Sequence, residues 1–160
     1  MRWSKLKKTV EDTFAESVRG RIHVFSTRYQ CSCGRAWITV NGKELVDLST
    51  MLSRLIYRCY YHEATNTNCL THPAVKDEDR TPGNLVERGE FSRFDFHEAC
   101  WNYIHSNLNE SLSSNNPLIV ALAVLNGKVG KQKLNKMLAG DLHPLPKKLI
   151  EIRIDAEKID

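Results

Sequence analysis

The chain has 160 residues, of which 41% are hydrophobic and 26% charged. These fractions are ordinary for a globular protein and exclude collagen-like, disordered and coiled-coil architectures. The net charge of +4 is too small to indicate nucleic-acid binding by itself. A chain of this length is expected to form a single domain over residues 1–160.

The cysteines and the N-terminal residues predict a cytoplasmic protein. An odd number of cysteines, five, favours reduced thiols. No apolar stretch follows the first lysines, so no secretory signal is indicated. The longest apolar run, Leu118–Leu125, is far shorter than the ~20 residues that cross a membrane. We therefore expect no membrane contact.

A helix and a small sheet are predicted for the first fifty residues. Ser4 is expected to cap a helix whose apolar residues recur every four, with Gly20 as its stop. Three stretches then alternate apolar and polar residues, and Asn41-Gly42 between two of them predicts a hairpin. The sequence thus favours a three-stranded antiparallel meander with strands near 22–29, 35–41 and 43–48.

Helices are predicted for most of the remaining chain. Ser49 is expected to cap the second helix and Asn115 the fourth. The third is expected to begin at a capping box of Asp95 and Glu98 and to run to Leu112, with Trp101 on its apolar face. The fourth is apolar nearly all round, which places it at the centre of the core. Two further helices are expected at Lys131–Leu138 and, in preference to a strand, at Lys147–Lys158.

Residues 64–90 have no clear period and predict an irregular loop, a flexible insertion, or a short helix near Leu85. The expected fold class is therefore α+β. It consists of an N-terminal helix, the three-stranded antiparallel meander, and then about four helices packed on one sheet face.

Two C-x-x-H pairs raise the hypothesis of a zinc site formed by Cys59, His62, Cys69 and His72. The spacing matches no standard zinc finger, and a buried cysteine satisfies the same pattern. We therefore expect no cofactor and keep zinc as an alternative. Side chains that could add ligands occur elsewhere in the chain: Cys31, Cys33, His97 and Cys100.

Catalytic motifs are missing from the sequence. It contains no G-x-S-x-G elbow, and neither His-Glu pair has the second histidine that a zinc protease requires. An enzyme remains an alternative in which His23, Tyr29 and His97 converge on one pocket.

A basic elbow at 126–138 is the third candidate. A helix, a turn with glycines, and a helix carrying lysines resemble the layout of a helix-turn-helix. The lysines that would contact nucleic acid are Lys128, Lys131, Lys133 and Lys136. An ordinary helical hairpin with solvated lysines fits the same pattern.

Three stretches carry a family resemblance: Trp3-Ser-Lys-Leu-Lys-Lys8, Gly34-Arg-Ala-Trp-Ile-Thr-Val-Asn-Gly-Lys-Glu44, and the segments that begin at Phe91 and Ser114. Over most of residues 1–140 the chain resembles a family of small, uncharacterised bacterial cytosolic proteins. The resemblance implies no particular activity. Relatives have a richer basic segment where this chain has Asn126–Lys133, so the resemblance implies a weaker anion-binding segment here.

Together these observations favour a non-enzymatic module that acts by contact with another protein. Nucleic-acid binding through the basic elbow and zinc binding are the alternatives. The residues do not identify the partner or the oligomeric state.

Overall fold

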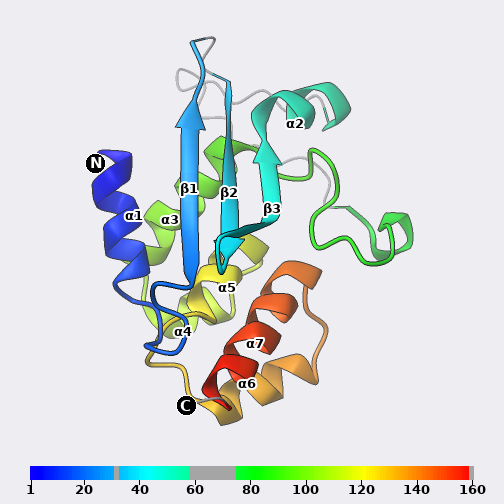
Figure 1. Cartoon of the computed structure of the whole chain (residues 1–160). Helices are drawn as coiled ribbons and strands as arrows, with labels where there is room; N and C mark the ends of the chain where they lie inside the picture. Colours follow the sequence, from blue (N-terminus) through cyan, green and yellow to red (C-terminus); the bar gives the residue numbers. More distant parts are fainter. Residues whose placement is uncertain (31–32, 58–74, 159–160) are drawn as a thin grey trace.

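The computed structural model describes residues 1–30, 33–57 and 75–158. Figure 1 shows the sheet at the front, α1 (Trp3–Glu11) beside one of its edges, and the helices from residue 93 onward behind and below it. The expected α+β architecture is confirmed. Six α-helices, rather than about four, follow the sheet in the described part of the chain. None of the described helices is both long enough and apolar enough to cross a bilayer.

The sheet is the predicted antiparallel meander. Its strands are β1 (Ile22–Arg28), β2 (Gly34–Val40) and β3 (Lys43–Ser49), in the order β1-β2-β3. Asn41 and Gly42 have φ values of 51° and 78°, which a two-residue hairpin turn of this kind requires. The inner face contributes buried Val24, Ile38 and Leu48 to the core.

The first helix is shorter than its apolar period predicts. It ends at Glu11, nine residues before Gly20, and Ser4 lies inside it rather than at its N-cap, which is Arg2. The chain leaves the helix because residues 13–15 bond to another segment: Ala15 N donates to the Leu125 carbonyl, and Gly127 N donates to the Thr13 carbonyl.

The second predicted helix starts where expected, and the third is displaced and divided in two. Helix α2 (Thr50–Tyr57) has the expected cap, since Leu52 N donates to Ser49 Oγ. Helix α3 (Arg93–His105) begins three residues earlier than predicted, with Ser92 and Asp95 forming the capping box. It also ends at His105, where Asn107 caps a separate helix, α4 (Leu108–Leu112). Trp101, expected on the buried face, is 38% exposed.

The last three helices complete the core. Helix α5 (Pro117–Ala123) is capped by Asn116, one residue after the predicted Asn115, and is almost entirely buried as expected. Helix α6 (Lys131–Leu138) matches the prediction. Helix α7 (Pro144–Glu157) confirms a helix rather than a strand and begins three residues early, because His143 caps it.

Residues 75–92 form no helix near Leu85. Their one helical turn is η3 (Asp77–Asp79), after which the chain runs beside β3 and enters α3. In Figure 1 this segment is the green loop next to β3.

Candidate functional site

The structure describes none of the four predicted zinc ligands. Cys59, His62, Cys69 and His72 all lie outside the described part of the chain, as does Cys31. Cys33 and Cys100 are buried. Within residues 1–30, 33–57 and 75–158, no group of three or more potential ligands could hold a metal ion.

The three residues of the catalytic alternative do not share a pocket. His23 contacts the Glu11 carboxylate and the Gly20 carbonyl. Tyr29 follows the opposite end of the same strand, about 20 Å away at 3.3 Å per residue. His97 packs its ring against the Trp3 ring, with 5.9 Å between centroids.

The basic elbow is exposed and rigidly held. Lys128, Lys131, Lys133 and Lys136 are all exposed, and none of them forms an ion pair with a described residue. The turn before α6 is fixed by Arg153, a side chain only 3% exposed. Its guanidinium donates to the carbonyls of Val124, Asn126 and Val129 over 2.6–2.7 Å.

The two edge strands of the sheet differ in whether other groups bond to their outward backbone, and this difference defines the candidate site. At the β1 edge, Val24 N donates to Glu11 Oε1 over 2.9 Å, and Lys7 Nζ donates to the Val24 carbonyl over 2.7 Å. Lys7 and Glu11 also pair with each other. Side chains of α1 therefore occupy the outward backbone groups of Val24, through which another strand would join β1.

The β3 edge has no such cover among the described residues. Val24 lies opposite Ile38 and directs its backbone N–H and carbonyl away from β2, so these two residues are a non-hydrogen-bonded pair. The backbone groups of Ile38 therefore point toward β3, where they bond to Val46. The neighbouring Asp47 must then direct its N–H and carbonyl outward. No backbone hydrogen bond joins these two groups to another described segment.

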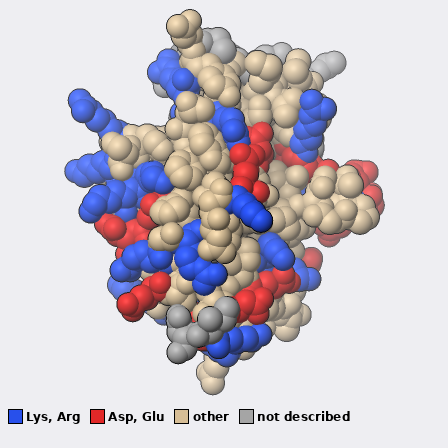
Figure 2. All heavy atoms as spheres, in the orientation of Figure 1, with Lys and Arg blue, Asp and Glu red and all other residues tan. Residues whose placement is uncertain are grey.

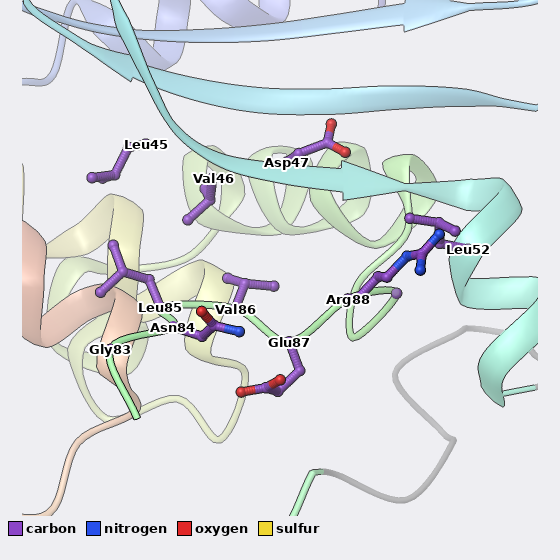
Figure 3. A pocket seen from close by; sticks show the side chains of 11 residues that line it. Leu45, Val46, Asp47, Leu52, Gly83, Asn84, Leu85, Val86, Glu87 and Arg88 are labelled. Atoms are coloured by element: carbon purple, nitrogen blue, oxygen red, sulfur yellow. The ribbon is translucent and has the colours of Figure 1, made fainter. Parts of the chain in front are cut away.

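A groove lies beside this open edge (Figure 3). Its volume is about 430 Å³, and its other wall is the segment 83–89, which we call the strap. Figure 3 shows Val46 pointing from β3 toward the strap, Leu85 pointing back toward β3, and Glu87 pointing away from the groove. The lining is mixed, because the apolar side chains of Val46 and Leu85 lie beside polar ones such as Asn84 and Arg88.

The strap is held in place by a buried carboxylate. Glu90, 3% exposed, accepts hydrogen bonds from the Arg80 guanidinium over 2.6 and 3.1 Å, from His143 Nε2 over 2.8 Å, and from Glu87 N over 2.9 Å. Since His143 Nδ1 accepts from Leu145 N, the ring proton lies on Nε2. One carboxylate thus joins both ends of the segment to the start of α7.

Burial alone would raise the pKa of Glu90. The hydrogen bonds from His143 and Arg80 outweigh that effect and hold the pKa at about 2, below its ordinary 4.5. The carboxylate is therefore charged at neutral pH, and the anchor of the strap is an ion pair.

A glycine at each end of the strap adopts a backbone conformation that lets the chain turn there. Gly83 and Gly89 have φ values of 89° and 78°, a region that other residues rarely adopt. Gly89 also lies directly against α2, where an added Cβ would be 2.7 Å from the Leu52 carbonyl oxygen. This contact closes the groove at the α2 end.

Sequence reasoning identified the irregular character of residues 64–90 but not the groove. The glycines at 83 and 89 were a usable signal, because a pair of glycines around an apolar Leu-Val dipeptide is typical of a segment that turns at both ends. The pairing of Glu90 with Arg80 and His143 had no signal in the sequence, since Glu90 and His143 are 53 positions apart.

Fold and site together define an α+β protein with one blocked and one open sheet edge, the open edge facing a groove. Residues 2–154 match the model of the SF0329 protein family, so the chain belongs to that family. The expected membership in an uncharacterised family is thereby confirmed. No curated protein and no solved structure matches the chain.

Proposed function

We propose that this protein is a non-enzymatic interaction module that binds an extended segment of a partner protein as a fourth strand on β3. The observation that carries the proposal is the outward backbone edge of Asp47 facing a groove. Extended peptides recognise such an edge through main-chain hydrogen bonds, while side-chain pockets supply specificity.

The groove also favours a particular kind of peptide. A strand added beside β3 alternates its side chains between the two sheet faces. On the inner face they meet Val46, Leu85 and Leu52, so apolar residues fit there. On the outer face Glu44 and Asp47 share a single cation, Arg35, which leaves one negative charge and favours a basic residue.

A proline substitution tests the proposal at one atom. Asp47→Pro removes the outward N–H without touching the bonds to β2, since proline is tolerated on edge strands with its nitrogen toward solvent. Asp47→Ala is the matched control, because it loses the same carboxylate and keeps the N–H. The probe is a library of random peptides displayed on phage and selected on the native protein.

We expect the selected peptides to alternate apolar and basic residues, to bind Asp47→Ala with at most a small loss, and to lose binding to Asp47→Pro. Peptides that bind both variants equally would contradict the proposal. So would a selection that yields no peptide above background.

The proposed setting is the cytoplasm of a bacterium. The odd cysteine count, the buried thiol of Cys100 and the sequence resemblance support it. Recovery of the native protein in the membrane or exported fraction of its host would contradict it.

Nucleic acid is a second candidate, favoured by the four exposed lysines without ion pairs on a rigid turn. If each contacts a phosphate, affinity falls with salt, and each lost lysine reduces the slope of log K against log salt by about 0.9. Fluorescence anisotropy with duplex DNA measures this. Replacing Lys131 and Lys133 by Gln should reduce affinity and slope, whereas the same change at Lys5 and Lys43 should not. Equal losses in both pairs would contradict a specific contact.

A further inference from the structure

Three basic side chains meet at the end of the sheet where β1 and β2 are linked. Arg28 is the last residue of β1 and is paired with Gly34. Arg93, the first residue of α3, crosses Gly34 so closely that an added Cβ there would lie 2.8 Å from Arg93 Cδ. His97 follows Arg93 by one helical turn and therefore lies on the same face of α3. The lack of a side chain at Gly34 thus allows β1 and α3 to bring these groups together.

Aromatic rings lie against both Arg93 and His97. The Arg93 guanidinium carbon lies 4.7 Å from the centre of the Phe94 ring, and Arg93 Nε is buried without a hydrogen-bond partner among the described residues. The His97 ring packs against Trp3. A half-buried guanidinium carries a desolvation cost that a bound anion would offset.

No carboxylate in the described part of the chain forms an ion pair with Arg93 or His97. Burial lowers the pKa of Arg93, and the nearby positive charge of Arg28 lowers it further. Burial likewise lowers the pKa of His97, and Arg93 adds to the effect. Figure 2 shows Lys and Arg side chains gathered over α1 and the adjoining end of β1, so an approaching anion meets an attractive field.

We propose that Arg28, Arg93 and His97 form a binding site for a phosphate monoester of a small molecule. Guanidinium groups bind phosphate oxygens in pairs, and the imidazole adds a further N–H. A carboxylate has only two oxygens to share among these donors, whereas a phosphate monoester has three. The site is separate from the groove, since it involves the end of β1 and not the edge of β3.

Calorimetric titration with inorganic phosphate and with ethyl phosphate, at constant ionic strength, tests the site. We expect saturable binding of both that is weakened about tenfold or more by Arg28→Gln or Arg93→Gln, as expected for loss of a charged hydrogen bond. Arg21→Gln removes the same charge from an exposed arginine at the other end of β1 and should leave the affinity unchanged.

A second readout separates binding from a purely structural role of Arg93. Without phosphate, Arg93→Gln should raise the unfolding temperature, because it removes repulsion between like charges. With phosphate present, the native protein should gain stability and Arg93→Gln should not. The proposal is overturned by absence of saturable binding, by an equal loss in Arg21→Gln, or by a lower unfolding temperature of Arg93→Gln with unchanged phosphate affinity.

Discussion

The buried carboxylate that anchors the strap gives the most quantitative prediction. Glu90→Gln keeps the size of the side chain and removes its charge, so Arg80 loses its buried ionic partner and His143 loses a charged acceptor for its Nε2–H. At about 1.4 kcal/mol per pH unit, a pKa held at about 2 instead of 4.5 stabilises the native state by about 3 kcal/mol. At neutral pH, Glu90→Gln should therefore reduce the free energy of unfolding by about 3 kcal/mol, a size also expected when a buried ion pair loses one partner.

The stabilisation by Glu90 depends on pH, and the direction of that dependence follows from its lowered pKa. Because the pKa of Glu90 is lower in the folded state than in the unfolded state, the stabilisation is fully present above about pH 4.5. It is lost as the pH falls toward 2. Urea denaturation of the native protein and of Glu90→Gln, repeated across this range, should show the difference shrinking with acidity.

Glu78→Gln serves as the control, since Glu78 lies on the same segment and its side chain is 77% exposed. It should leave the free energy of unfolding unchanged. A difference between Glu90→Gln and the native protein that stays constant from neutral pH to pH 2 would refute the reasoning, as would equal effects of the two substitutions.

Three further predictions concern the scaffold. Arg153→Met leaves three carbonyls without their donor and should reduce the free energy of unfolding by about 3 kcal/mol or more, measured by urea denaturation; a change below that of a surface substitution would contradict it. Gly89→Ala should cost about 2–3 kcal/mol, because its positive φ adds to a clash with Leu52, whereas Gly83→Ala meets open space and should cost about 1 kcal/mol. Equal costs for the two glycines would show that the strap does not press on α2. Burial raises the pKa of Cys100 far above its usual range, so mass spectrometry after iodoacetamide treatment of the native protein should find Cys100 unmodified, and its rapid labelling would contradict the packing of α3.

Local signals in the sequence predicted local structure well. Asn41-Gly42 predicted the hairpin because positive φ at two successive residues is a property of those residues themselves. The apolar run from Leu118 predicted the buried α5, because the hydrophobicity of a run is also a property of its own residues. The start of α3 was predicted from Asp95 and Glu98, whereas Ser92 and Asp95 form the capping box. A serine three residues before an acidic residue is the usual pattern of such a box, so the signal was present and was overlooked.

Contacts between distant segments account for the errors. The four-residue spacing of Leu6, Val10, Phe14 and Val18 predicted one helix, and all four side chains are indeed buried. The helix nevertheless ends at Glu11, because residues 13–15 bond to the chain near Leu125. The candidate groove is of the same kind: it depends on which strand forms the open edge and on where Glu90 ties the strap, and neither follows from local pattern.

The measurement that tests the account most directly is hydrogen exchange of single backbone amides in the free protein, followed by NMR. If the β3 edge is open, the Asp47 amide exchanges fast while its neighbours Val46 and Leu48, bonded to β2, exchange slowly. The Val24 amide at the opposite edge should also be slow, because Glu11 covers it. An Asp47 amide as protected as that of Val46 would show that the edge is already occupied and would contradict the proposed binding of a partner strand.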